Sequence, residues 1–270
     1  MTTSPLGELG SLTTHFAAAP VEGGLGVVPL EVRPGYVRAR IPIGCSGSRH
    51  DGRVSALLLA VAADCGLGVG VHSSVPGSSG GPTVEMRLDM AGSLAPGTDS
   101  LELEGRALDV GGVAGTGRVE MRDASGVLIA TAVGVMSIDR AARVPAQEPE
   151  PAVLLDPDTV VVRPESPDGA VSAVRLVDGM QNSMGTVHGG VLAALADGAQ
   201  EVFRDRAGAT RPLSLTVDYL RPAHVADRLL SCHSAFVRRG RRFWTVRTEI
   251  RRPDGGVVLH ATGTSLVLPG

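Results

Sequence analysis

One segment of the chain, residues 182–200, holds the densest group of potentially reactive residues. It reads NSMGTVHGGVLAALADGAQ, and the residues of interest are Asn182, His188, Gly189, Gly190 and Asp197. Carboxylates and imidazoles are the usual groups for moving protons, and backbone amides can bind an oxyanion. The question is whether these residues form one active site together or belong to two.

The glycine pair is expected in the first turn of a helix that begins at or just after His188. Each glycine costs a helix about 1 kcal/mol relative to alanine, so the pair needs a compensating reason. Without Cβ atoms, the free N–H groups of a helix start can approach a ligand oxygen, where the helix dipole favours negative charge. The Gly189 or Gly190 amide is therefore a candidate oxyanion donor. The alternative is a tight loop-to-helix corner without a ligand.

Asp197 lies in the middle of the same helix, among Ala, Leu and Val residues. A carboxylate in such surroundings is a candidate base, and the alternative is one that only hydrogen-bonds across the core. A rise of about 1.5 Å per residue separates it from His188 by roughly 13 Å, so the two cannot meet on one helix. If two copies of the unit pair with antiparallel helices, the Asp of one copy can approach the helix start of the other.

The chain supplies such a second copy, because it repeats itself once. The segment GRVSALLLAVAADCG at 52–66 aligns with GTVHGGVLAALADGA at 185–199, an offset of 133 residues. This alignment places Asp64 opposite Asp197. Two later pairs of segments align at offsets of 128 and 130 residues, and so small a drift is what duplication with loop changes produces.

We predict an α+β fold of two tandem domains, each an antiparallel sheet wrapped around one long central helix. The apolar runs place the helices at roughly 53–66 and 188–204, and the two units are expected to pair within the chain. The predicted boundaries are an N-terminal segment at 1–20, a first domain at 21–140, a linker rich in Pro, Glu and Ala at 141–157, and a second domain at 158–270.

Composition narrows the class of partner. The net charge of −3 and the aromatic content of 3% disfavour nucleic acid and anionic membranes. The chain start lacks the pattern of a signal peptide, and the long apolar stretch at 54–71 contains Asp64 and three glycines, so we expect a buried helix. The three cysteines, Cys45, Cys65 and Cys232, lack metal-ligand spacing. We expect a cytoplasmic protein without a metal site.

The motif NSMGTVHGG, followed by LAD and SLTVDYLRPA, resembles the hotdog-fold acyl-CoA thioesterases of the phenylacetate-pathway type. The resemblance covers about 180–268 closely and, through the repeat, about 25–140 more weakly. It implies a tandem hotdog protein, whose halves form an intrachain pseudo-dimer, that hydrolyses an acyl or aryl-acyl thioester. Coenzyme A would enter as part of the substrate, with no other cofactor.

The resemblance also implies roles for individual residues. The amide of Gly190 or Gly189 would polarise the thioester carbonyl, and Asn182 and His188 would position the thioester. An Asp from the opposite half would act as general base on water or as nucleophile, and the sequence leaves these two mechanisms open.

The first copy departs from the motif. Its helix start carries Ser55, Ala56 and Leu57 where the second copy has His188, Gly189 and Gly190, and Arg49 stands at the position of Asn182. Only Asp64 is retained. Because a side chain at Leu57 should block close approach, we expect one working site per chain, with Asp64 as its carboxylate and Asp197 on the inactive side.

Two further residues belong to this hypothesis. Thr83, near the start of the strand after the first helix, is expected to place a hydroxyl beside Asp64 and hold the water. His50 is a displaced histidine that could restore the first site, although a surface-loop position is favoured because its register differs by five residues.

The run VRRGRR at 237–242 is the strongest basic patch of the chain, and its arginines are Arg238, Arg239, Arg241 and Arg242. By resemblance this turn tends to lie near the nucleotide end of coenzyme A, whose phosphates arginine clamps; a solvated hairpin is the alternative. We expect a small acyl-CoA substrate, no nucleic-acid or membrane partner, and a homodimer of double-hotdog chains.

Two other functions compete with hydrolysis. A non-catalytic acyl-CoA binder or sensor could use the same fold, since a fold does not fix a function. A hotdog hydratase or dehydratase would be expected to show a Gly-Asp-x-Asn-Pro-x-His or His-Phe-Pro-Gly stretch, and neither is found in the sequence.

Overall fold

The structure is a computed structural model that describes residues 19–44, 53–78, 80–139, 160–166, 168–206 and 210–268. The predicted linker, most of the predicted N-terminal segment, Cys45, Arg49 and His50 lie outside the described residues.

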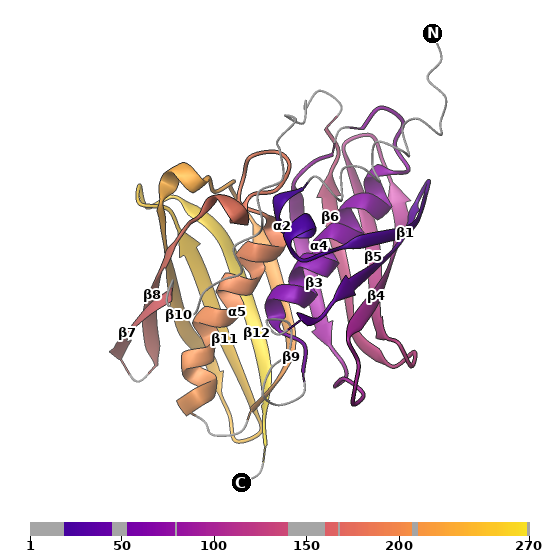
Figure 1. The fold of residues 1–270 in the computed structure, drawn as a ribbon. Helices are drawn as coiled ribbons and strands as arrows, with labels where there is room; N and C mark the ends of the chain where they lie inside the picture. The colour runs from indigo at the N-terminus through magenta and orange to yellow at the C-terminus, as the bar shows by residue number, and fades with distance from the viewer. Residues whose placement is uncertain are drawn as a thin grey trace.

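In the described part of the chain, twelve antiparallel strands form one continuous sheet (Figure 1). The strands of the first repeat are β1 (Val28–Arg33), β2 (Tyr36–Pro42), β3 (Thr83–Met90), β4 (Ser100–Val110), β5 (Ala114–Asp123) and β6 (Leu128–Ser137). Those of the second repeat are β7 (Val160–Ser166), β8 (Gly169–Arg175), β9 (Thr210–Tyr219), β10 (Leu229–Arg239), β11 (Phe243–Arg251) and β12 (Val257–Val267).

The strand order shows the duplication directly. It runs β1-β2-β4-β5-β6-β3-β9-β12-β11-β10-β8-β7, so each half has the same topology and the second half follows in reverse. The halves join where β3 pairs with β9, with Leu88 opposite Leu215 and Met86 opposite Val217. The predicted α+β fold with two tandem hotdog-like units, paired within one chain, is therefore confirmed.

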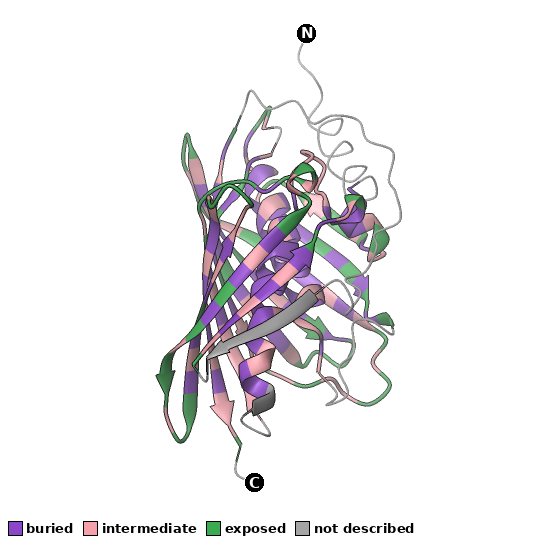
Figure 2. Cartoon of the chain, turned by 90° about the vertical axis from the view of Figure 1, so that its left-hand side faces the viewer, coloured by how far each residue is buried: buried purple, intermediate pink, exposed green. Residues whose placement is uncertain are grey.

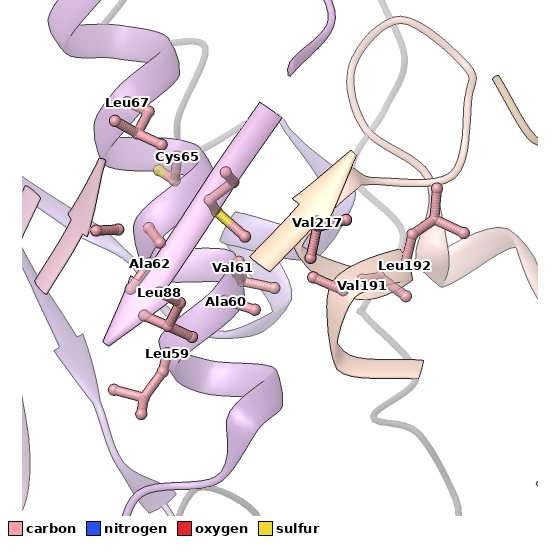
Figure 3. Packing of buried hydrophobic residues seen from close by; sticks show 14 of the residues in the cluster. Leu59, Ala60, Val61, Ala62, Cys65, Leu67, Leu88, Val191, Leu192 and Val217 are labelled. Carbon is pink, nitrogen blue, oxygen red and sulfur yellow. The ribbon is translucent and has the colours of Figure 1, made fainter. Parts of the chain in front are cut away.

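Two long helices lie side by side on the same face of this sheet (Figure 1): α4 (Ala56–His72) and α5 (Gly189–Arg206). Buried and exposed residues alternate along the strands (Figure 2), as expected for a sheet with one face covered. Side chains of both helices, among them Val61 and Val191, join Val217 of β9 in one apolar cluster (Figure 3).

The first helix starts three residues after its predicted start, and it ends at His72 rather than at about residue 66. Ser55 caps its start by accepting a hydrogen bond from the Leu58 amide at 3.3 Å. The helix continues through Gly66, Gly68 and Gly70, and it packs closely on the sheet at Gly66. A Cβ atom at Gly66 would lie only 2.8 Å from the Val119 side chain. Tertiary packing here overrides low helix propensity.

Within the ranges that the structure describes, the short helices are α2 (Pro20–Gly24), η2 (Asp178–Met180) and η3 (Val225–Asp227). The first of them contacts η2 and α4, so residues near the chain start reach the centre of the molecule. Within the described ranges, no helix combines the length and the apolar character that crossing a bilayer requires.

Candidate active site

Asp64 lies where the two repeats meet. Its carboxylate, in the middle of α4, faces the start of α5. The Gly190 N–H donates to Oδ2 at 3.0 Å, and the hydroxyl of Thr83, the first residue of β3, donates to Oδ1. Only 11% of the Asp64 side chain is exposed. The positive end of α5 therefore points at a carboxylate of the other repeat, and the expected proximity of Asp64 to the glycine pair is present.

A side chain is excluded at Gly189 and at Gly190 for different reasons. A Cβ atom at Gly189 would lie 2.8 Å from Asp64 Oδ2, so this glycine makes room for the carboxylate. A Cβ atom at Gly190 would lie 2.6 Å from the Ala60 carbonyl oxygen and from Val61 Cα, so this one allows α4 and α5 to cross closely. The close approach expected at the helix start is therefore present at both positions. Gly189 approaches the Asp64 carboxylate, and Gly190 approaches the backbone of α4.

His188 lies between two carboxylates. Its Nδ1 is 3.2 Å from Asp64 Oδ2, and its Nε2 is 3.1 Å from Glu22 Oε1. Glu22 belongs to α2 and is mostly buried. Sequence analysis missed Glu22, which matches no motif; the one available signal was an acidic residue within the apolar segment AAAPVEGG.

These carboxylates determine the charge of His188. Burial by itself lowers the pKa of the imidazole, but attraction by Glu22 and Asp64, together with the hydrogen bond to Glu22, raises the pKa to about 9. His188 is therefore an imidazolium at neutral pH, with Nε2–H donating to Glu22 and the ring forming an ion pair with Asp64 through Nδ1. The Gly190 nitrogen also lies 3.0 Å from His188 Nδ1, a contact that is a hydrogen bond only when Nδ1 has lost its proton.

Two more side chains adjoin this group. The Tyr219 hydroxyl donates to the Gly189 carbonyl at 2.9 Å and so fixes the first turn of α5. Burial, with the nearby Asp64 charge, raises the pKa of Tyr219 well above its usual range. Burial, with the charges of Glu22 and Asp64, likewise raises the pKa of the Cys65 thiol. Both groups are neutral at neutral pH, and a thiol in this state is a poor nucleophile.

Asn182 organises the loop that leads into α5. Its Nδ2 donates to Thr186 Oγ1 at 2.9 Å, and its Oδ1 accepts from the amides of Met184 and Thr186 at 2.9 and 3.1 Å. The Asn182 side chain lines the same cavity as Asp64, but the two side chains do not contact each other. The geometry makes Asn182 a support for the loop, beside the thioester-positioning role that the resemblance implies.

A cavity of about 740 Å³ opens beside these residues. Asp64, Thr83, Asn182, His188 and Gly189 line it, together with one face of α4 formed by Cys65, Gly68, Val69 and His72. Far along that face, His72 Nδ1 and Ser78 Oγ are 3.0 Å apart. At the rim, Val84 and Leu220 are 45% and 51% exposed, and Arg221 follows Leu220. Within the described ranges, no group of three His, Cys, Asp or Glu side chains could hold a metal ion.

The comparisons with known proteins agree with this architecture. Residues 177–266, in the second repeat, match the family model described as acyl-CoA thioesterase N-terminal domain. A solved structure from Alicyclobacillus acidocaldarius, a conserved protein of unknown function described as having a hot dog fold, is similar over 86% of this chain and 94% of that chain, at 15% identity and a TM-score of 0.63. The chain has a double hotdog fold.

Other double hotdog relatives cover even more of the chain. The tesB protein of Mycobacterium avium subspecies paratuberculosis matches 97% of this chain and 99% of its own, at 11% identity and a TM-score of 0.65. Acyl-CoA thioesterase II TesB2 from Mycobacterium marinum matches 93% of this chain and 97% of its own, at 16% identity and a TM-score of 0.61. At such identities the likeness concerns the fold. No curated protein matches the chain in sequence, and the phenylacetate-pathway type stays a prediction.

Asp197 occupies the pseudo-symmetric position in this double hotdog and has a different environment. Both of its carboxylate oxygens accept hydrogen bonds from the buried Arg204 guanidinium, at 2.9 and 2.8 Å. The cavity beside it holds only about 70 Å³ and is lined by Val54, Ala56 and Arg211 among others. The structure therefore does not bring Asp197 to the Asp64 site. Sequence analysis missed Arg204, whose signal was its position two helical turns after Asp197.

The four arginines of the basic run do not line the cavity of Asp64. They lie at the turn between β10 and β11, where Phe243 pairs with Leu266 and Leu266 pairs with Arg211 at the start of β9. The cavity adjoins the other end of β9, about 30 Å away along ten residues. The expectation that Arg238, Arg239, Arg241 and Arg242 bind the nucleotide of a substrate in this cavity is not supported.

Arg239, in the basic run, lies over two aromatic rings. The Arg239 guanidinium lies 5.2 Å from the Trp244 ring centre and 5.5 Å from that of Phe236. The arginine at the rim of the cavity is Arg221, from the segment LRPA. Sequence analysis quoted this segment for its resemblance without assigning it a role.

Proposed function

We propose that the protein hydrolyses acyl-CoA thioesters at one composite site per chain, built from Asp64 and Thr83 of the first repeat and the start of α5 in the second. The observation that carries this proposal is the 3.0 Å contact between the Gly190 amide and the carboxylate of Asp64, a residue that lines a large cavity together with Gly189. The match of the second repeat to an acyl-CoA thioesterase domain supports the choice of thioester.

The proposed chemistry starts with the thioester carbonyl oxygen. When it reaches the start of α5, it competes with Asp64 for the Gly190 N–H, which then stabilises the negative charge that develops on the oxygen. Asp64, released from that amide and held at Oδ1 by Thr83, either takes a proton from a water molecule whose oxygen attacks the carbonyl carbon, or attacks that carbon itself. In both routes the C–S bond then breaks and the coenzyme A thiolate leaves and takes up a proton. The first route gives the free acid directly, and the second gives an acyl–Asp64 anhydride that water hydrolyses to the free acid.

The cavity is compatible with such a substrate. Its volume of about 740 Å³ lies within the usual range for small-molecule sites. The face of α4 with Gly68 and Val69 gives the acyl or aryl group an apolar surface. We place the nucleotide outside the cavity near Arg221, because a guanidinium at the rim is suited to bind phosphate.

The test is thiol release from a panel of short, long and aromatic acyl-CoAs by the wild type and two variants. Asp64→Asn should lower kcat by about 10²- to 10⁴-fold, the usual range for a proton-transfer residue. Asp197→Asn, the matched change in the other repeat, should retain kcat in the fraction that folds. Loss of activity in Asp197→Asn alone contradicts the assignment. Tight binding of acyl-CoA without thiol release would instead support a non-catalytic binder.

A further inference from the structure

Glu22 is a buried carboxylate for which the proposed reaction has so far no use. It comes from α2, before the first strand, and its Oε1 lies 3.1 Å from Nε2 of His188 in the other repeat. His188 is itself 3.2 Å from Asp64 through its other ring nitrogen. The two carboxylates and the imidazole thus form a row that ends at the carboxylate of the proposed site.

The position of Glu22 dictates which proton His188 loses first. A carboxylate lies near each ring nitrogen, but only the contact of Nε2 with Glu22 is a hydrogen bond, and Nδ1 is also approached by the Gly190 N–H. Nε2 therefore keeps its proton, and deprotonation of the ring bares Nδ1. A bare Nδ1 accepts a hydrogen bond, and the Gly190 nitrogen lies only 3.0 Å from it. A protonated Nδ1 cannot accept, so the Gly190 N–H then has only oxygen acceptors. The ionisation of His188 therefore decides whether this amide is available to a carbonyl oxygen.

We infer that Glu22 is a positioning residue, which holds His188 as an imidazolium and so keeps the Gly190 amide free to bind the thioester oxygen. This inference rests on the proposed function. Glu22 acts entirely through His188 and needs no contact with substrate.

The charges around His188 support this role. Burial lowers the pKa of the imidazole, and the attraction of Glu22 is the larger of the two carboxylate effects that reverse this. Among the described residues, the other titratable groups that adjoin the row are Cys65 of α4 and Tyr219 of β9, and burial raises the pKa of both. They remain uncharged near neutral pH and so add no charge beside His188.

The experiment combines a pH profile with a direct titration. In the wild type, kcat/KM for acyl-CoA hydrolysis should fall on the alkaline side with an apparent pKa of about 9. Glu22→Gln should move this limb to lower pH by at least about one unit, so the variant approaches the wild type at pH 6 and loses roughly tenfold or more at pH 8.5. Glu22→Asp keeps the charge and should move the limb back towards the wild-type position.

NMR titration of ring-labelled histidine gives a readout that needs no activity, with the His188 signal assigned by its loss in His188→Gln. Its pKa should be near 9 in the wild type and lower in Glu22→Gln. Glu249→Gln is the matched control, since Glu249 forms a Glu–His pair with His260 at 3.0 Å away from the site. It should leave the His188 titration and the alkaline limb unchanged.

The outcomes separate this inference from the proposed function. An unchanged His188 pKa in Glu22→Gln, or an ordinary His188 pKa in the wild type, overturns the inference even if hydrolysis is observed. A shifted His188 pKa with an unmoved alkaline limb overturns it as well. Absence of hydrolysis for every thioester, with the titration as expected, contradicts the proposed function instead. If Glu22→Gln does not fold, the wild-type titration and Glu22→Asp still decide.

Discussion

The Asp64 carboxylate and the Gly190 amide come from different repeats and meet at 3.0 Å. Neither repeat could make this contact alone, because Asp64 lies in the middle of one helix and Gly190 at the start of the other. Pairing of the two helices within one chain does what an interface between two subunits would otherwise do. The second repeat supplies the amide that donates the hydrogen bond, and the first repeat supplies the carboxylate that accepts it.

Alanine at the two glycines should have different effects. In Gly190→Ala the new Cβ would meet the backbone of Ala60 and Val61 at 2.6 Å, so the helices must shift, and both stability and hydrolysis should fall. In Gly189→Ala the Cβ would meet the Asp64 carboxylate at 2.8 Å, which can rotate away. This variant should keep more of its stability and lose about 10²- to 10³-fold in kcat, as when an oxyanion contact is lost.

Gly198→Ala serves as the control for these glycine variants. A Cβ atom at Gly198 meets nothing within 4 Å, so alanine there should stabilise α5 by about 0.5–1 kcal/mol and leave kcat unchanged. Thermal unfolding and steady-state kinetics measure both effects. Equal losses of kcat in the Gly189 and Gly198 variants would remove the support for a specific role of the helix start.

The Thr83 hydroxyl should matter for rate more than for folding. A hydrogen bond to a charged group contributes about 1.5–3 kcal/mol, so Thr83→Val should lower kcat by about 10- to 100-fold. Thr83→Ser keeps the donor and should stay within a few-fold of the wild type. Kinetics with one good acyl-CoA substrate compare the three proteins, and equal activity of the valine and serine variants would show that the bond to Asp64 is dispensable.

The duplication, both helices and the pairing of Asp64 with the glycine helix start could be predicted because they depend on local pattern and on one repeat offset. The same reasoning failed for the contacts that the sequence does not encode locally. Glu22 reaches His188 across 166 positions, and no periodicity connects them. The basic run was chosen for the nucleotide and Arg221 was given no role, because only the register of β9, β12 and β11 shows that the basic run lies at the far end of the sheet from the cavity.

The start of α5 could be predicted because the glycine pair marks it. The start of α4 lies three residues after its predicted position, at the cap of Ser55, and the helix continues past residue 66 because Gly66 packs closely against Val119. The expected homodimer of double-hotdog chains rests on the resemblance alone, and light scattering on the purified protein would measure it.

The ion pair of Asp197 and Arg204 should contribute to stability and not to hydrolysis. Both side chains are buried, so Arg204→Met leaves an unpaired carboxylate and should cost about 3–5 kcal/mol, on the order of 10 °C in Tm. The rate per folded molecule should be unchanged. The double variant Asp197→Leu with Arg204→Met removes both charges and should recover much of the lost stability. A folded Arg204→Met protein without activity would place this pair in the reaction.

Gly68 should control how long an acyl group the cavity accepts. A Cβ atom at Gly68 would have Met136 Cε as its nearest neighbour, at 3.6 Å, so the space around Gly68 is open. In Gly68→Leu the larger side chain should project into the cavity, so kcat/KM for long-chain acyl-CoAs should fall by tenfold or more while that for acetyl-CoA stays the same. The ratio of the two substrates within one preparation corrects for partial unfolding. An unchanged ratio would mean that the acyl group does not run along α4.

The stability of the fold should decline with rising pH because of His188. Its pKa is about 6.5 in the unfolded chain and about 9 in the folded protein, so the folded state holds the proton more tightly. The resulting stabilisation is complete below pH 6.5 and is lost as the pH rises through 9. Burial raises the pKa of Cys65, Cys232 and Tyr219, so these groups give a decline of the same sign, but only above their pKa values in the unfolded chain, about 8.5 for Cys and about 10 for Tyr. The window that reports His188 is therefore pH 6.5 to 8.5, and we expect Tm to fall by several degrees across it. His188→Gln has no proton to lose, and its Tm should be lower at pH 6.5 and much flatter with pH; a wild-type slope in this variant would assign the decline to other groups.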